Sequence, residues 1–372
     1  MYIKELVKRI DGWLILLMLI LVSIGVIAIN SATAYSGDTS YVQKQIIFFI
    51  MGLGLMLIVM SIDYHLLARW YIIIYIGIII LLIAVFFIGK NAKGATRWIE
   101  LGFIRIQPSE FAKIGMILCG ATIINKYNKR INQLWPILII GIFEFIPFIL
   151  VNRQPNLSTS IVMIVILVIQ LFMSKLDFKF IATTAMVGLL VVVIAFVYIV
   201  KNDDQKLIQD YQRNRIMSMV YGGDESADKY QTQRAVRAIG SGGLQGKGLY
   251  QGSISQLNYL PEAHNDFIMA VIGEEFGFVG AVSVVAILLA FIFRGLWIAR
   301  GAPDDLGRLI VVGYIGMIAM QGFVNMGVVT DLLPNTGIPI PFISYGGSSL
   351  WANMMGLGLV LNVARRREEK MF

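Results

Sequence analysis

The chain has 372 residues, of which 57% are hydrophobic and only 15% are charged, and its net charge is +8 at pH 7. Soluble domains are nearer 45–50% apolar and about 25% charged, so these values exclude an ordinary soluble enzyme and a disordered protein. A single cysteine excludes an intramolecular disulfide, and with only two histidines no Cys/His cluster has the spacing of a zinc site. The composition is typical of a protein that crosses a membrane several times.

Ten apolar runs are each long enough, or nearly so, to cross a bilayer, which takes about 20 residues in a helix. They are residues 13–31, 45–62, 70–89, 107–125, 134–151, 157–174, 179–200, 266–293, 307–330 and 343–363. The runs are continuously apolar and lack the alternation of barrel strands. We therefore expect an all-α polytopic membrane protein with about ten transmembrane helices, in which residues 1–372 form a single domain.

Lysine and arginine predict the orientation of these spans. If the N-terminus is cytoplasmic, the inner segments hold 16 of these residues and the short outer loops hold six. Positive charge is concentrated on the cytoplasmic side of membrane proteins, and an even number of spans then puts both termini there. We expect the basic residues to face anionic membrane lipids, and we expect no nucleic-acid partner.

The longest connection, residues 201–265, lies outside in this orientation, between the seventh and eighth spans. Its first part, to Lys229, is interpreted as a flexible amphipathic segment. Its second part places Ser241, Gly243 and Lys247 in a glycine-rich run. Glycine lets backbone N–H groups approach and bind an anion such as phosphate. The alternative is that these glycines only turn the loop, and the glycines taken alone favour it.

The loop ends at Asp266, at the start of the eighth span, after Glu262 and His264. Asp266 is either a helix N-cap, which accepts backbone N–H bonds, or a carboxylate held at the outer surface to take a proton or hold a cation. Glu274 and Glu275 lie about two turns further into the span, where a carboxylate needs a partner.

Two further segments carry polar residues at the outer ends of spans. Glu110 and Lys113 start the fourth span at i, i+3 spacing and can pair, either as a structural ion pair or as part of a substrate cavity. Just upstream, Arg97 beside Trp98 suits either a phosphate or a headgroup anchor.

The last outer loop, residues 333–342, contains three prolines and leads into Ser344 and Tyr345. Irregular backbone in a membrane protein is tolerated where it is buried in protein or lines an aqueous cavity. The pattern predicts a cavity open to the outer face, with close packing of small residues between helices as the alternative.

Five segments resemble the SEDS family (shape, elongation, division and sporulation), which includes RodA and FtsW. They are GATRWI from Gly94, QPSEFAK from Gln107, IGSGGL from Ile239, LPEAHNDFI from Leu260 and TGIPIPFISYGGSS from Thr336. The resemblance implies a peptidoglycan glycosyltransferase of the bacterial cytoplasmic membrane that polymerises lipid II for cell elongation and shape. It also implies a class B penicillin-binding protein as partner. Residues 253–262 look more like the RodA version of this segment than the FtsW version.

By this resemblance Asp266 is the catalytic residue, either as a general base or as the ligand of a divalent cation (Mg or Mn), and no organic cofactor is expected. The candidate substrate-binding residues are Arg97, Trp98, Glu110, Lys113, Ser241, Gly243, Lys247, Gln256, Glu262, His264, Ser344 and Tyr345. The chain departs from the family at Asn156 and Ser158, where Asp and Gly are usual, at Asn265, where Thr is usual, and at Arg237, where a neutral residue is common.

Two other classes of function fit parts of the sequence. Interrupted helices and intramembrane charges also suit a transporter, here a lipid II flippase, and a non-catalytic scaffold for the penicillin-binding protein is a third hypothesis. The halves show no clear internal repeat, and the polar signals gather at one face rather than at the midplane. The sequence therefore favours the enzyme.

Overall fold

The computed structural model describes residues 11–35, 37, 39–92, 95–102, 104–202, 208, 213, 217, 227–257 and 259–366. Gly94, the basic residues of segments 1–10 and 367–372 that entered the orientation argument, and almost all of the segment 203–226 lie outside the described residues. The expectation of a flexible amphipathic segment there stays a prediction.

Each of the ten predicted spans overlaps one helix of the described chain. The helices are α2 (Gly12–Ala34), α3 (Ser40–Ser61), α5 (Tyr71–Ile88), α6 (Pro108–Tyr127), α7 (Leu134–Arg153), α8 (Leu157–Phe172), α9 (Phe178–Lys201), α13 (Ile268–Arg300), α14 (Asp305–Val329) and α15 (Gly347–Arg366). Shorter helices connect them: α4 (Tyr64–Arg69), α11 (Ala227–Gly242) and α12 (Ser253–Gln256). The helical membrane fold is confirmed.

Seven of these helices are long and apolar enough to cross a membrane: α2, α3, α5, α7, α9, α13 and α14. Helix α8 is apolar but has 16 residues, and the largely buried α6 and α15 are less apolar. A helix that is covered by neighbouring helices does not need an apolar surface all round. The count of ten spans and the orientation of the termini stay predictions.

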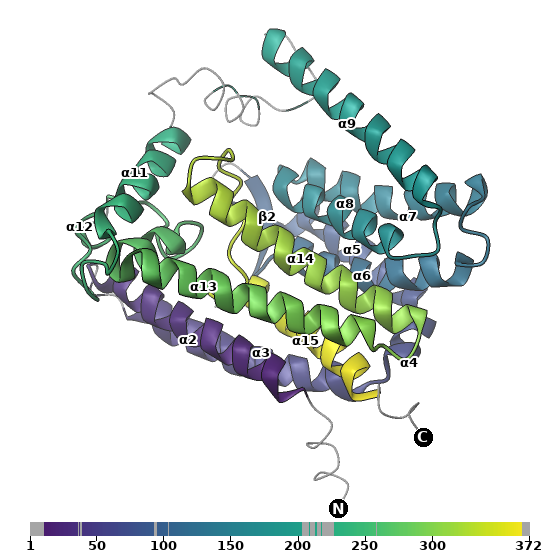
Figure 1. Ribbon diagram of the computed structural model, residues 1–372, viewed down its shortest axis with the longest axis horizontal. Coiled ribbons are helices and arrows are strands. Elements are labelled where there is room, and N and C mark those ends of the chain that lie inside the picture. The colour runs from purple at the N-terminus through teal and green to yellow at the C-terminus, as the bar shows by residue number, and fades with distance from the viewer. Residues whose placement is uncertain are drawn as a thin grey trace, which may run out of the picture.

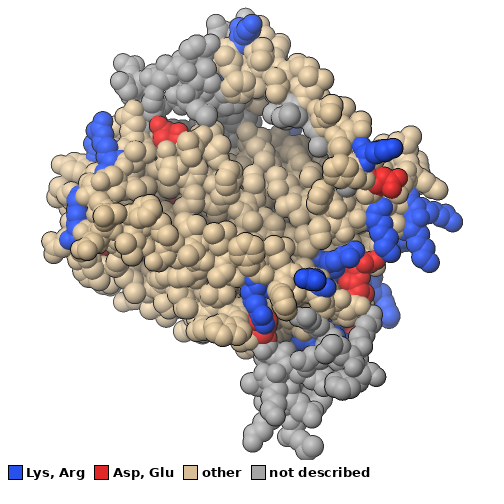
Figure 2. Space-filling view, in the orientation of Figure 1, with Lys and Arg blue, Asp and Glu red and all other residues tan. Residues whose placement is uncertain are grey.

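The core lies where α14 packs against α6, α8 and α13, while α15 packs along α3 and α13 along α2. Figure 1 shows α9 inclined away from this bundle. Most of the described apolar side chains of α9 are exposed. In Figure 2 the charged side chains gather toward the edges of the view, and the broad middle of the visible face is uncharged. We call the end that carries α11 and α12 the outer end, following the predicted orientation.

Between α5 and α6 the chain forms a small antiparallel sheet that the sequence analysis did not predict. Its strands are β1 (Lys90–Ala92), β2 (Ala95–Leu101) and β3 (Ile104–Ile106), in the order β1-β2-β3. Glu100 on β2 lies opposite Arg105 on β3, and their side chains form an ion pair of 2.9 Å. The sheet places β2, with Arg97 and Trp98, beside the start of α6.

Candidate active site

Asp266 lies at the outer end of the bundle, directly before α13. The N-cap position of this helix is held by Phe267 rather than by Asp266, so the structure does not bear out the N-cap interpretation. The backbone carbonyl of Asp266 accepts a hydrogen bond from Nδ2 of Asn325 at 2.8 Å. The residue is half-buried, so it is partly accessible at the surface of the protein.

The loop that precedes α15 passes next to this carboxylate. A Cβ atom placed on Gly337 would lie 3.5 Å from Oδ2 of Asp266. Gly337 has a φ of +66°, a conformation that glycine adopts without strain, and its N–H donates to Oδ1 of Asn335 at 3.2 Å. The predicted irregular segment before the tenth span is confirmed. Helix α15 begins at Gly347, four residues after the start of the predicted span 343–363.

His264, two residues before Asp266, belongs to a group of three aromatic rings. Its ring centroid lies 4.6 Å from that of Tyr41 and 5.5 Å from that of Tyr345. The N–H of Tyr345 donates to the carbonyl of His264 at 3.0 Å. The structure thus brings together three predicted site residues, Asp266, His264 and Tyr345, and adds Tyr41 from α3.

Ser344 and Glu262 shape the backbone around this group. The Oγ atom of Ser344 accepts the N–H of Ile340 at 2.9 Å, which folds the loop before α15. Glu262 has a φ of +56° and accepts Nδ2 of Asn265 at 3.3 Å, so the small polar residue that departs from the family has a local partner. Both residues are close in sequence to the residues they brace.

No three His, Cys, Asp or Glu side chains of the described residues are arranged to hold a metal ion. A cation at Asp266 would therefore take its other ligands from further oxygen atoms, such as those of water and of the phosphates of a substrate. The Mg or Mn ion stays a prediction.

The length of α13 sets the height of Asp266 above the membrane. Its 33 residues span about 50 Å at 1.5 Å per residue, more than a hydrocarbon core of about 30 Å. The turns up to Glu275 are covered by protein, and exposed apolar side chains begin at Phe276 and Phe278. The helix changes direction at Gly277, whose φ of 66° and ψ of −162° are not helical.

The kink at Gly277 therefore separates a protein-covered outer part of α13 from a part with exposed apolar side chains. About 20 residues separate it from the exposed Trp297 near the inner end, which is the length that a bilayer core requires. Asp266 lies eleven residues before the kink, on the side of the outer end. The predicted span 266–293 overlaps α13, which is long and apolar enough to cross a membrane, and the position of the bilayer along this helix stays a prediction.

Arg97 reaches the loop between α7 and α8 from strand β2. Its Nη2 atom donates to the carbonyl of Pro155. Beside it, Asn156 caps α8 and donates Nδ2 to Oγ of Ser109 at 3.2 Å. Ser158 donates Oγ to the carbonyl of Thr336 at 2.6 Å. Both departures from the family therefore make contacts, and Ser158 joins this loop to the loop beside Asp266.

Trp98 follows Arg97 on β2, opposite Lys90 of β1. It is half-buried at the outer end, and its predicted contact with the substrate stays a prediction.

Glu110 and Lys113 form the predicted i, i+3 ion pair on α6. The Nζ atom lies 2.9 Å from Oε2 of Glu110, and the side chains are only 6% and 2% exposed. A buried pair of this kind is held by its mutual charge, because removal of one partner leaves the other uncompensated. The structure thus confirms the pair and places it inside the protein.

The other four predicted residues, Ser241, Gly243, Lys247 and Gln256, lie in a second group around the outer turns of α13. The Nζ atom of Lys247 is 2.7 Å from Oε1 of Glu274. Gly243 accepts the N–H of Phe278 at 2.9 Å, beside the kink, and Ser241 donates to its own helix at Ala238.

Gln256 completes this second group. It donates Nε2 to the carbonyl of Ser31 at 2.9 Å and to Oε1 of Glu275 at 3.3 Å. Glu275 also accepts Oγ of Ser31 at 2.5 Å. Glu274 and Glu275 therefore both have the partners that the sequence analysis required, and the loop 243–256 is fastened to α2 and α13. A substrate contact for these four residues stays a prediction.

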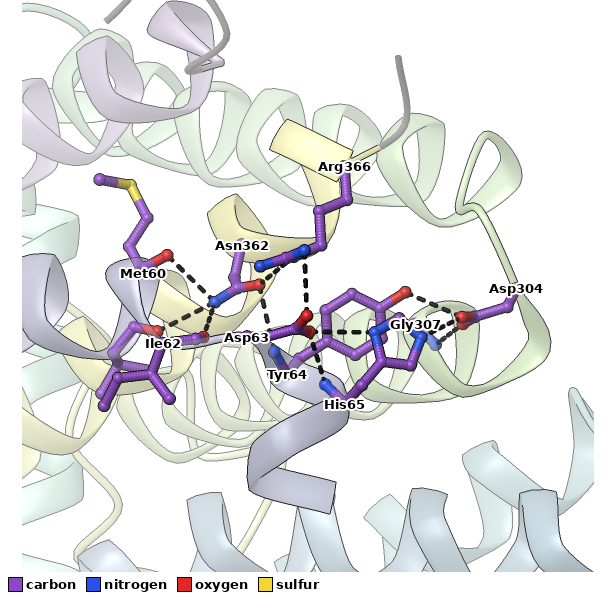
Figure 3. Close-up of polar contacts among 10 residues, drawn as sticks. Met60, Ile62, Asp63, Tyr64, His65, Asp304, Gly307, Asn362 and Arg366 are labelled. Carbon is purple, nitrogen blue, oxygen red and sulfur yellow. Dashed lines mark hydrogen bonds and ion pairs between the residues drawn. The ribbon is translucent and has the colours of Figure 1, made fainter. Parts of the chain in front are cut away.

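A separate polar cluster lies at the inner end (Figure 3). His65 is placed between two carboxylates, with Nδ1 3.0 Å from Oδ1 of Asp63 and Nε2 2.6 Å from Oδ2 of Asp304. Tyr64 donates to Asp304 at 3.0 Å, and Arg366 pairs with Asp63 at 3.1 Å. The cluster joins the turn after α3 to the start of α14 and the end of α15.

Comparisons with known proteins assign the chain to a family. The family model of the FtsW, RodA and SpoVE cell cycle proteins matches residues 12–369. The chain belongs to this family.

Relatives in the FtsW/RodA/SpoVE family match over nearly their full length. The peptidoglycan glycosyltransferase MrdB of Escherichia coli strain K12 is 38% identical over 364 residues, which cover 97% of this chain and 95% of that protein. The probable peptidoglycan glycosyltransferase FtsW of Geobacter metallireducens is 32% identical over 377 residues, covering 98% and 96%.

Solved structures give the same result. A chain of a peptidoglycan synthase complex, solved to show how polymerization and crosslinking are coordinated, aligns with a TM-score of 0.83 at 27% identity, covering 97% of this chain and 99% of that one. The rod shape determining protein RodA of Thermus thermophilus aligns with a TM-score of 0.72 at 27% identity, covering 96% and 97%.

Three residues near Asp266 were missed by the sequence analysis: Asn325, Gly337 and Tyr41. Asn325 carried a usable signal, since a polar side chain within an apolar span is expected to face a partner inside the bundle. Gly337 and Tyr41 carried none, because glycine and tyrosine are common in loops and at the ends of membrane helices.

Proposed function

We propose that this protein is a peptidoglycan glycosyltransferase that polymerises lipid II into glycan strands for cell elongation and shape, at the outer face of the bacterial cytoplasmic membrane. The support from relatives is the 38% identity with the glycosyltransferase MrdB over nearly the whole chain. The observation that carries the proposal is the half-buried carboxylate of Asp266, which lies at the outer end of the bundle against an irregular loop.

Lipid II carries a disaccharide-pentapeptide on an undecaprenyl pyrophosphate. In chain growth the C4 hydroxyl of one sugar attacks the anomeric carbon of another, so that a C4–O–C1 bond forms and the bond from C1 to the pyrophosphate oxygen breaks. Asp266 accepts the hydroxyl proton as a general base, and the lipid pyrophosphate leaves. With one carboxylate in place, direct inversion at C1 is favoured by analogy with inverting glycosidases.

The height of Asp266 suits this substrate. A lipid-linked pyrophosphate rests at the headgroup level, and its sugars extend outward from there. Asp266 lies on the outer side of the kink at Gly277, where it faces the sugars rather than the lipid chain. The rings of His264 and Tyr345 lie against each other, with His264 two residues before Asp266, and aromatic rings with polar edges are suited to pack against sugars.

The remaining candidate residues fall into two kinds. Arg97 and Trp98 lie on β2 at the outer end and support a role at the pyrophosphate, a group that arginine binds well. Glu110 and Lys113 face each other inside the bundle, and we propose that they line the inner wall of the substrate cavity.

The proposed partner is a class B penicillin-binding protein, the transpeptidase that crosslinks the new strands. The support is the similarity to a chain of a peptidoglycan synthase complex in which polymerization and crosslinking are coordinated. Co-purification of the two proteins from membranes tests this proposal.

A polymerisation assay tests the function. Purified protein in detergent is mixed with lipid II, and glycan strands are separated on a gel. We expect strands from the wild type and a loss of about 100-fold or more in Asp266→Asn, because a general base contributes 10²–10⁴-fold. Asp331→Asn is the matched control, since Asp331 is an exposed aspartate at the end of α14 with a φ of 60° that asparagine tolerates.

The outcomes separate the three hypotheses. A flippase or a scaffold makes no strands in detergent, so an inactive, well-folded wild type would overturn the proposal. Wild-type activity in Asp266→Asn would remove this residue from the mechanism. EDTA, followed by Mg²⁺ or Mn²⁺, tests the predicted cation in the same assay.

A further inference from the structure

Asn325 links two segments that meet at the outer end. The residue lies on α14 and is only 1% exposed. Its Nδ2 atom donates to the carbonyl of Asp266 at 2.8 Å and to the carbonyl of Ile338 at 2.7 Å. A side-chain amide has two N–H hydrogens, and both are used, one on each segment.

These two bonds set the geometry around the carboxylate. Ile338 directly follows Gly337, the residue whose Cα faces Oδ2 of Asp266. On the other side of Gly337, the carbonyl of Thr336 accepts Oγ of Ser158 at 2.6 Å. The three-residue segment 336–338 is therefore held from α8 at one end and from α14 at the other, with the carboxylate against its middle.

The amide of Asn325 stabilises the structure only through its two donors. Within the described residues its Oδ1 atom is buried and has no hydrogen-bond partner. A buried polar atom without a partner costs about 1–3 kcal/mol; leucine would avoid that cost but would leave the carbonyls of Asp266 and Ile338 without this donor. What an apolar side chain cannot do is hold the backbone of Asp266 at a fixed distance from the loop.

We propose that Asn325 is a positioning residue for the carboxylate of Asp266, with Ser158 as the second anchor of the same loop. Asn325 does not act on substrate itself; it fixes the backbone on which the general base is carried. The expected effect on kinetics rests on the proposed function. The expected effect on structure rests on the two hydrogen bonds from Asn325 to the carbonyls of Asp266 and Ile338.

The kinetic test uses Asn325→Leu in the lipid II assay. A misplacement of about 1 Å in a catalytic group costs about 100-fold, so we expect kcat to fall 10- to 100-fold while KM stays within two-fold. Asn353→Leu is the matched control, because the amide of Asn353 on α15 is equally buried and makes no hydrogen bond in the described structure. It should keep wild-type kcat.

Ser158 supplies a milder variant in case Asn325→Leu does not fold. Ser158→Ala loses one anchor and should lower kcat several-fold, and Ser158→Thr, which keeps the hydroxyl, should restore it. A lower melting temperature in these variants, with a normal kcat per folded molecule, would assign both residues a structural role only.

Hydrogen–deuterium exchange tests the structural part without activity. Peptides covering 333–346 and 260–268 should exchange faster in Asn325→Leu, while peptides from the middle of α13 should not change. Unchanged exchange in these two peptides would overturn the inference even if the wild type polymerises lipid II. Faster exchange in a protein that makes no glycan strands would support the structural role of Asn325 and reject the proposed function.

Discussion

The ammonium of Lys247 lies 2.7 Å from the carboxylate of Glu274, and this pair fastens the glycine-rich loop to the outer turns of α13. Glu274 is fully buried and also accepts the N–H groups of Ile254 and Ser255, each at 2.9 Å. One carboxylate thus gathers donors from both parts of the loop. The contact gives Lys247 a role in holding the loop, next to its predicted role at the pyrophosphate.

Lys247→Met separates these two roles. We expect the free energy of unfolding to fall by about 1–3 kcal/mol, because a buried carboxylate loses a charged donor, while KM for lipid II stays unchanged. Thermal unfolding in detergent and steady-state kinetics measure the two effects. A higher KM at an unchanged melting temperature would instead assign the lysine to the substrate.

Lys113→Met tests the buried pair on α6. The change leaves Glu110 as an uncompensated carboxylate in the bundle, which costs about 3–5 kcal/mol. The double variant Glu110→Gln with Lys113→Met removes both charges and should recover most of the lost stability. If the double variant melts as low as the single one, the pair is not what stabilises this region.

Gly337→Ala tests the close approach of the loop to Asp266. Alanine at a positive φ costs about 1–2 kcal/mol, and the new methyl group would lie 3.5 Å from the carboxylate. We expect kcat for lipid II polymerisation to fall about 10-fold or more. Gly102→Ala is the control: Gly102 has a φ of +63° but nothing within 4 Å of its Cβ position, so it should show a similar loss of stability with normal kcat.

The inner cluster in Figure 3 predicts a pH dependence of stability. Burial by itself would raise the pKa of Asp304, but hydrogen bonds from the N–H of Gly307, from His65 and from Tyr64 lower it overall below 3.8. The pKa of Asp63 is lowered in the same way by the N–H and ring of His65 and by Arg366, against the effect of burial. A carboxylate with a lower pKa in the folded chain stabilises the fold above its unfolded pKa, and loses this effect as the pH falls through the folded value.

Asp304→Asn isolates this charge, because asparagine caps a helix about as well as aspartate. At pH 7 we expect the variant to melt lower than the wild type, by about 1–2 kcal/mol in unfolding free energy. The difference should be constant above about pH 5 and shrink below about pH 4. A difference that does not change between pH 7 and pH 3 would show that the ionised carboxylate is not the cause.

The helices could be predicted because each depends on its own residues. A continuous apolar run of about 20 residues has few stable forms in a bilayer other than a helix, and all ten predicted ranges overlap helices. The pair between Glu110 and Lys113 was predicted for the same reason, since i, i+3 spacing brings two side chains together on any helix.

The sheet at Lys90–Ile106 was missed because its strands are three to seven residues long, too short for a period-2 pattern to be distinguished from a loop. The burial of the first turns of α13 could not be predicted for a different reason. These turns are apolar and covered by protein, and composition does not distinguish a protein environment from lipid.

The residue types alone established a multi-pass helical membrane protein with an acidic group at one end. The length of an apolar run and the spacing of nearby residues are properties of contiguous sequence, so they do not depend on the tertiary structure. The meeting of Asp266, Asn325 and Gly337 was decided only by the folded bundle. Asn325 is 59 residues from Asp266 in the sequence and 13 from Ile338. Hydrogen bonds between such distant segments depend on how the helices pack, and packing is a property of the whole molecule.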